Sequence, residues 1–169
     1  ARAGEIGLDP AYVYGLIRQE SRFVMDARSN VGASGLMQIM PATARWTAKK
    51  IGLPYSAELI TDRDTNLRLG ANYLKLVLDD FSGSQALAAA AYNAGPSRSR
   101  RWRDGPVLDP AVWAENVPFP ETRDYVKKVL SNATYYAAQL GATAPSLKQR
   151  LGRTIAPAGP LTPLDKELP

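Results

Sequence analysis

Apolar residues recur along this chain at intervals of three and four, the spacing that places side chains on one face of an α-helix. In the first such stretch Val13, Leu16 and Ile17 form an apolar stripe, and Glu20 takes the next position on it. A carboxylate on an apolar helix face costs free energy unless it is paired or protonated. The spacing therefore indicates either a structural ion pair or an acid with a shifted pKa, and the pattern alone leaves both open.

Helix start and stop signals extend this pattern along the chain. Asp9 and Asp109 each precede a proline, which is tolerated at the first helical position, and their side chains can cap the free amides of a first turn. The expected helices begin at Pro10, Pro41, Asp62 or Asp64, Ser84, Pro110 and near Glu121, and the marked ends are Gly52, Gly83, Gly95, Glu115 and Gly141. No stretch alternates with a period of two between hairpin turns. The predicted fold class is therefore all-α, a compact multi-helix domain with at most a minor hairpin near the loops.

The segment after the first helix combines a loop with an apolar run. From Asp26 to Gly35, small polar residues and glycines predict a shaped loop that directly follows Glu20. Residues 36–40 are apolar except for Gln38, and a buried amide needs several hydrogen-bond partners, which backbone groups can supply. Met40 in this run is also compatible with core packing, because methionines often fill gaps. The run is thus either core or the wall of a site.

Composition narrows the chemistry that the chain can perform. It has 169 residues, no cysteine, no histidine and a net charge of +5. The length suits one domain, and the missing residue types exclude thiol catalysis, serine–histidine triads and the usual zinc sites. Acid–base chemistry then falls to Asp, Glu, Tyr or Lys, and no metal or cofactor is expected. The positive charge, which includes Arg98, Arg100, Arg101 and Arg103, favours an anionic partner, although such clusters are usually solvated faces.

The two ends of the chain differ from its middle. No segment reaches the run of about 18 uncharged apolar residues that crosses a bilayer, and the first residues lack the regions of a signal peptide. Because the chain starts without Met, we expect a processed product or an excised domain. After residue 145 the helical periodicity is lost and prolines recur. We therefore predict one domain over residues 1–145 and an extended proline-rich tail over residues 146–169.

Four motifs occur in a fixed order along the predicted domain: RQES, GASGLMQIMP, AAYNAGP and VPFPETRDYV. Together they resemble the catalytic domain of soluble lytic murein transglycosylases, bacterial enzymes that act on peptidoglycan, and four ordered motifs are more specific than one. The resemblance covers roughly Ile6 to Leu140. It implies a lysozyme-like helical fold of the goose type with a central substrate groove, here without the large N-terminal helical ring that many soluble members carry.

The resemblance also implies roles for individual residues. Glu20 matches the family's single catalytic acid. Six further positions match residues of the substrate groove: Ser29, Gln38, Met40, Tyr92, Asn93 and Glu121. Without the resemblance, Tyr92 is equally compatible with a core tyrosine at a helix end, and Glu121 with a carboxylate that favours the positive end of a helix dipole.

The implied activity is cleavage of the MurNAc–GlcNAc β-1,4 bond of peptidoglycan with formation of 1,6-anhydro-MurNAc ends. Most glycosidases use two carboxylates, whereas in this family one glutamic acid acts first as acid and then as base. An apolar environment that includes Leu36 and Met40 is expected to raise the pKa of Glu20. The implied location is the periplasm or cell envelope. Peptidoglycan glycan strands are the implied partners, and cell-envelope assembly partners are compatible with the resemblance.

Two alternatives to this function stay open at the level of sequence. One is a goose-type lysozyme, in which water attacks in place of the sugar hydroxyl. The other is a noncatalytic peptidoglycan-binding or scaffolding module, against which the retention of Glu20 and its flanking motifs argues. A nucleic-acid-binding role rests on charge alone, without a recognised motif, and ranks last.

Overall fold

The computed structural model describes residues 6–23, 27–30, 32–140, 154–158 and 168–169. Within them lie α2 (Pro10–Ser21), α3 (Pro41–Ile51), the 3-10 helix η1 (Ala57–Thr61), α4 (Arg63–Asp80), α5 (Gln85–Ala94), α6 (Pro96–Arg103), α7 (Pro110–Glu115) and α8 (Pro120–Gln139). The extended pairings among these residues are isolated bridges, two of which join Ser34 to Arg28 and to Ile39 in the loop after α2. The all-α prediction is therefore confirmed. In place of the minor hairpin that the prediction allowed, the described loop after α2 contains isolated bridges.

The predicted helix starts depend on side chains that cap free amides. Asp9 and Asp109 each accept a hydrogen bond from the backbone amide two residues ahead, at 3.0 Å and 2.9 Å. Asp62 and not Asp64 caps α4, because its Oδ2 accepts from the backbone N of Thr65 at 3.0 Å. Local sequence signals thus place these helix starts correctly.

Two short elements have no counterpart in the prediction. Gly95 ends α5 as expected, but Pro96 also serves as the first residue of α6, where its missing N–H is not needed. The second element is η1, which lies between α3 and α4. At the far end of the domain α8 stops at Gln139, and the predicted stop at Gly141 lies outside the described residues.

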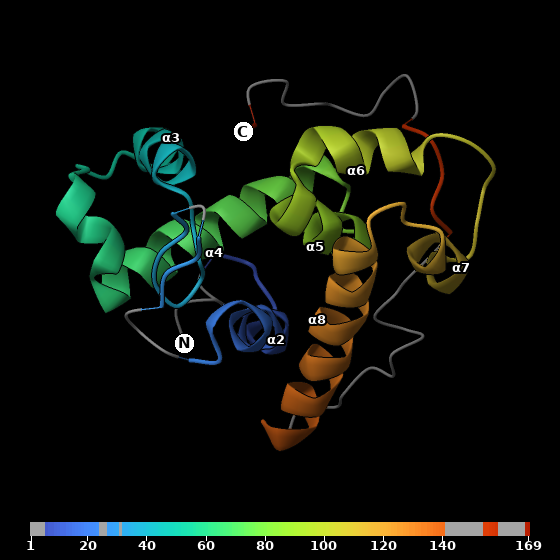
Figure 1. The fold of residues 1–169 in the computed structure, drawn as a ribbon, viewed down its shortest axis with the longest axis horizontal. Coiled ribbons are helices and arrows are strands. Elements are labelled where there is room, and N and C mark those ends of the chain that lie inside the picture. The colour runs from blue at the N-terminus through green and yellow to red at the C-terminus, as the bar shows by residue number, and fades with distance from the viewer. Residues whose placement is uncertain (1–5, 24–26, 31, 141–153, 159–167) are drawn as a thin grey trace.

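The contact between α2 and α8 brings together residues that are far apart in the chain (Figure 1). Gly15 lies at this contact, where an added Cβ would lie 2.7 Å from both Val129 O and Ala133 N. Only glycine lets the two backbones approach this closely. Similarly, α5 contacts α4, α6 and α8, and residues 86–91 of α5, all buried, are alanines except for one leucine. Small side chains therefore allow the helices to close around α5.

One buried side chain of α4 anchors the loop that follows α2. Asn66 accepts from the backbone N of Met37 at 2.9 Å and donates to Ser34 O at 2.9 Å and Ile60 O at 2.8 Å. Gly70, one turn further along α4, leaves the space that the Met37 side chain fills. The loop therefore packs closely against α4, because Asn66 hydrogen-bonds to its backbone and Gly70 leaves room for Met37.

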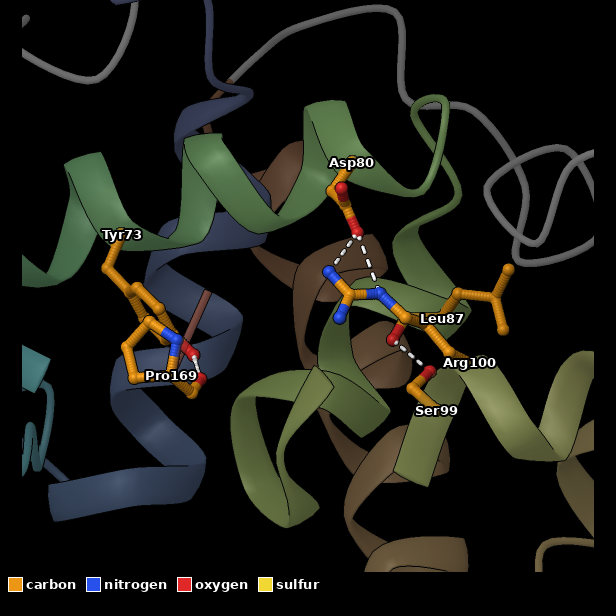
Figure 2. Close-up of polar contacts among 6 residues, drawn as sticks. All are labelled: Tyr73, Asp80, Leu87, Ser99, Arg100 and Pro169. Carbon is orange, nitrogen blue, oxygen red and sulfur yellow. Dashed lines mark hydrogen bonds and ion pairs between the residues drawn. The ribbon is translucent and has the colours of Figure 1, made fainter. Parts of the chain in front are cut away.

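Figure 2 shows two polar contacts that hold α6 against α4 and α5. Arg100 donates to Asp80 Oδ2 from Nη2 at 2.8 Å and from Nε at 3.2 Å, and the Ser99 hydroxyl donates to Leu87 O at 2.8 Å. The arginine cluster is thus not uniformly a solvated face, since Arg100 belongs to an ion pair with a buried carboxylate.

Parts of the predicted tail lie against the domain. Leu108 and Ile155 exchange two backbone hydrogen bonds, at 3.0 Å and 2.7 Å, and Ile155 is buried. Leu168 is also buried, and the Tyr73 hydroxyl donates to Pro169 O at 2.6 Å (Figure 2). The predicted boundary at residue 145 lies outside the described residues and stays a prediction.

Candidate active site

Glu20 lies in the last turn of α2, next to α8. The hydroxyl of Tyr125, on α8, donates a hydrogen bond to Glu20 Oε1 at 2.7 Å. The other carboxyl oxygen, Oε2, has no hydrogen-bond partner among the described residues. The packing of the two helices thus holds one oxygen of the carboxyl group, and no described residue holds the other.

The environment of Glu20 raises its pKa from 4.5 to about 7. Burial is the largest cause, because it disfavours the charged form. The hydrogen bond from Tyr125 acts in the opposite direction, and the negative charge of Glu121 adds a smaller increase. No lysine or arginine in the described part of the chain forms an ion pair with Glu20. The sequence left open whether Glu20 belongs to a structural ion pair or is an acid with a shifted pKa, and its surroundings correspond to the second interpretation.

Four of the residues predicted from the sequence line one pocket of about 210 Å³. Its lining residues are Gln38, Ile39, Met40, Thr43, Tyr73, Ala91, Tyr92, Asn93, Gly95 and Pro169. Glu20 is a neighbour of this pocket, because its charge raises the pKa of Tyr92 further above the ordinary value, after burial as the main cause. The pocket and the carboxyl group therefore form one candidate site.

Gln38 lines the pocket, and its side-chain amide is bonded to the backbone of the loop. Its backbone has a φ of 48°, and its Nε2 donates to Ala27 O at 2.8 Å and to Gly35 O at 2.7 Å. Both amide hydrogens are therefore used within the loop, and the carbonyl oxygen Oε1 has no hydrogen-bond partner among the described residues. Backbone carbonyls thus satisfy the donor group of this amide, as the sequence analysis allowed.

Tyr92 and Met40 complete the wall of the pocket in different ways. The Tyr92 hydroxyl donates to Met37 O at 2.6 Å, and its ring lies 5.8 Å from that of Tyr73. Tyr92 thus joins α5 to the loop and has already used its donor. Met40 precedes α3 and is 39% exposed, whereas Met37 is fully buried. Of these two methionines, Met37 is the core residue and Met40 lies at the pocket.

Asn93 and Glu121 lie at the junction of α5 and α8. The hydroxyl of Thr122 donates to Asn93 Oδ1 at 2.7 Å, and Asn93 lines the pocket. Glu121 is exposed and is not a lining residue, but it lies near enough to Glu20 for its charge to raise the pKa of Glu20. Asn93 therefore reaches the site from α5, and Glu121 reaches it from α8.

Ser29 is the one predicted groove residue that the structure does not bring to the pocket or to Glu20. It is exposed, its Oγ accepts from Ala33 N at 3.0 Å, and its backbone N donates to Ala33 O at 2.9 Å. These bonds close the tip of the loop. In this conformation Ser29 shapes the loop, and its role near the substrate stays a prediction.

The sequence reading missed three residues of the site. Tyr125 was expected to be a core residue of the last helix, and Tyr73 and Thr122 were not singled out. A signal was available for Tyr125: it lies in the same motif as Glu121, and a buried tyrosine usually needs a partner for its hydroxyl. No comparable signal identifies Thr122, because its partner Asn93 comes from another helix.

Two further features of the described residues concern metal ions and membranes. In the ranges that the structure covers, no three acidic, histidine or cysteine side chains lie close enough together to hold a metal ion. None of the helices described above is long and apolar enough to cross a bilayer.

Comparison with known protein families gives two matches. Residues 1–106 match the family described as the transglycosylase SLT domain. Residues 116–145 match the family described as the soluble lytic transglycosylase helical domain. Together these matches span almost all of the helices described above.

Individual relatives and solved structures agree with the family matches. The soluble lytic murein transglycosylase of Escherichia coli is 42% identical over 135 residues, which cover 78% of this chain and 21% of that protein. An inactive Glu-to-Gln mutant of lytic transglycosylase Slt from Pseudomonas aeruginosa superimposes with a TM-score of 0.84 at 45% identity, covering 91% of this chain and 25% of that one. The 70 kDa soluble lytic transglycosylase of E. coli gives a TM-score of 0.79 at 40% identity, covering 86% and 24%. The chain thus spans about a quarter or less of the length of these relatives, and the fold that it shares with them is the predicted lysozyme-like one.

Proposed function

Because this chain belongs to the soluble lytic murein transglycosylase family, we propose that it cleaves the MurNAc–GlcNAc β-1,4 bond of peptidoglycan and leaves 1,6-anhydro-MurNAc ends. The observation that carries the proposal is the Glu20 carboxyl group, which has a pKa of about 7 beside the pocket and is held by Tyr125. A Glu-to-Gln mutant of the P. aeruginosa relative is inactive, which is consistent with an activity that depends on a glutamate.

In the first step Glu20 acts as a general acid. Since Oε1 already accepts from the Tyr125 hydroxyl, the proton is carried on Oε2, the oxygen without a partner among the described residues. Glu20 donates this proton to the glycosidic oxygen, the bond from that oxygen to the MurNAc anomeric carbon breaks, and positive charge develops on that carbon. The N-acetyl group of the same sugar stabilises the charge, which replaces a second carboxylate.

In the second step the carboxylate of Glu20 acts as the base. It removes the proton from the C6 hydroxyl of the MurNAc, and the C6 oxygen bonds to the anomeric carbon to close the 1,6-anhydro ring. The proton thus returns to Glu20, and no water is consumed. The Tyr125 hydrogen bond favours the charged form of Glu20, so it stabilises the carboxylate between the two steps.

The proposed substrate also implies the cellular location and the binding partner of the protein. Peptidoglycan strands are the partner, so we place the activity in the periplasm or cell envelope. The net charge of +5 fits the carboxylates of the peptide stems.

Digestion of purified peptidoglycan followed by mass analysis of the products tests the proposal. We expect anhydro products from the wild-type chain and none from Glu20→Gln, with unchanged circular dichroism as proof of folding. Products heavier by one water would indicate hydrolysis of the goose-lysozyme type. Binding without any product would indicate a noncatalytic module.

A further inference from the structure

We propose that Thr122 is a positioning residue: it fixes the side-chain amide of Asn93 so that the Asn93 N–H groups bind an acetamido carbonyl oxygen of the glycan strand. This inference rests on the proposed function and names a specificity contact within the same site. It comes from one hydrogen bond between two helices, and from the donors and acceptors that the pocket has left.

The hydrogen bond joins the first turn of α8 to the last turn of α5. Thr122 is 1% exposed, and its hydroxyl donates to Asn93 Oδ1 at 2.7 Å. This is the hydroxyl's only hydrogen bond among the described residues, so without Asn93 a buried polar group would be left unsatisfied. The packing of α5 against α8 therefore favours the hydrogen bond between Thr122 and Asn93.

The orientation of the Asn93 amide follows from this bond. In the structure the carbonyl oxygen Oδ1 of Asn93 accepts from the Thr122 hydroxyl, so Oδ1 faces Thr122 and Nδ2 faces elsewhere. Nδ2 carries two donor hydrogens and has no partner in the part of the chain that the structure describes. Because Asn93 is partly exposed and lines the pocket, these hydrogens are available to a bound molecule.

The other amide-bearing and phenolic side chains of the pocket have used their donors. Gln38 donates both Nε2 hydrogens to backbone carbonyls, and the hydroxyls of Tyr92 and Tyr73 donate to Met37 O and Pro169 O. Asn93 therefore offers a neutral donor, and Gln38 offers a neutral acceptor. An amide group of a ligand, with one carbonyl oxygen and one N–H, complements this pair, and each sugar of the peptidoglycan strand carries such an acetamido group.

Binding measured in a Glu20→Gln background separates this inference from cleavage. The ligand is a tetramer of N-acetylglucosamine, compared with the same tetramer after de-N-acetylation. We expect Thr122→Val, which keeps the shape but removes the hydroxyl, to weaken binding of the acetylated tetramer by about threefold to tenfold, the range for one hydrogen bond. The de-N-acetylated tetramer should show no such difference, and Thr122→Ser should restore binding because it keeps the hydroxyl.

A double-mutant cycle with Asn93→Ala distinguishes positioning from a purely structural role. If Thr122 acts through Asn93, Thr122→Val should have no further effect on binding once Asn93 is alanine. Melting temperatures of the same variants report any loss of stability separately. Unchanged binding in Thr122→Val, or an equal loss with and without Asn93, would overturn the proposal. Absence of cleavage by the wild-type chain, with the binding pattern intact, would overturn only the proposed activity.

Discussion

A single carboxyl group illustrates how neighbouring residues control chemistry at the scale of one residue. Burial raises the pKa of Glu20 to about 7, while Tyr125 and Glu121 adjust it in opposite directions. Near pH 7, both the protonated and the charged form are therefore populated. This is the condition under which one group can serve as acid and then as base.

The pH dependence of cleavage follows from these causes. Since the protonated form of Glu20 is the acid, kcat/KM should fall as the pH rises through about 7. Glu121→Gln removes a negative charge that raises the pKa of Glu20, so the fall should move to lower pH. Tyr125→Phe removes a hydrogen bond that lowers this pKa, so the fall should move to higher pH. The measurement is the kcat/KM profile of each variant, and shifts in the same direction would contradict this account.

The same pKa predicts how stability depends on pH. Native Glu20 binds its proton up to about pH 7, whereas an unfolded glutamate releases it near 4.5, so the native state is destabilised as the pH rises between these values. Glu20→Gln has no such titration. Its free energy of unfolding, relative to wild type, should therefore increase by up to about 3 kcal/mol from pH 4 to pH 8, at about 1.4 kcal/mol per pH unit.

Urea denaturation at several pH values measures this difference. Glu115→Gln is a matched control, because Glu115 is exposed at the end of α7 and its ion pair with Lys127, at 2.6 Å, is a surface pair of the kind that contributes little to stability. A constant difference between wild type and Glu20→Gln over this pH range would show that Glu20 titrates normally.

At the scale of elements, the site depends on how closely α2 approaches α8. Gly15 permits this approach, and the Glu20–Tyr125 hydrogen bond is a consequence of it. The loop after α2 is held by a second close contact, in which Asn66 of α4 binds three backbone groups of its surroundings. Both contacts use residues with little or no apolar surface, so they specify geometry more than they contribute hydrophobic burial.

Gly15→Ala tests the first contact. The added methyl group would lie 2.7 Å from backbone atoms of α8, so the helices must move apart. Overpacking of this kind typically costs about 1–3 kcal/mol of stability. We expect this loss in urea denaturation, together with reduced kcat, because Tyr125 no longer reaches Glu20. Arg18→Ala, on the exposed face of the same helix, is the control and should change stability by less than about 0.5 kcal/mol.

At the scale of the whole molecule, segments that are distant in sequence complete the pocket. The loop after α2, α4, α5 and the residues at the end of the chain all contribute lining side chains. Pro169 is one of them, held by the Tyr73 hydroxyl at 2.6 Å, and Leu168 beside it is 6% exposed. A glycan strand that enters this pocket must therefore displace Pro169 or share the space with it.

Removal of residues 168 and 169 tests this competition. We expect KM for peptidoglycan to fall by about threefold to tenfold, which corresponds to about 0.7–1.4 kcal/mol of lost competition. Tyr73→Phe, which loses the hydrogen bond to Pro169 but keeps the ring, should change KM in the same direction by a smaller amount. Tyr135→Phe removes an exposed hydroxyl on α8 and is the control. A rise in KM after the deletion would show that Pro169 belongs to the wall that binds the substrate.

Local and short-range signals in the sequence were sufficient for much of the fold. Asp–Pro pairs, glycine stops and the apolar period predicted the long helices, because capping and helical periodicity depend on residues within about four positions of each other. The stripe around Glu20 and the four ordered motifs also drew attention to this carboxyl group and to four of the residues that line the pocket. α6 was missed because Pro96 follows the end of one helix and begins the next, and η1 was missed because this five-residue 3-10 helix has no side-chain cap to mark its start.

The sequence by itself determined the long helices, the family and the position of an acid on an apolar face. Only the tertiary structure decided between an ion pair and an acid with a shifted pKa in the described residues. Tyr125, the hydrogen-bond partner of Glu20, lies 105 positions away and is brought to it by the packing of α8 on α2. The same is true of Thr122 beside Asn93, and of Pro169 in the pocket. The pKa of Glu20, the orientation of the Asn93 amide and the place of Pro169 in the pocket all depend on contacts between distant segments. The spacing of residues along one helix does not encode such contacts.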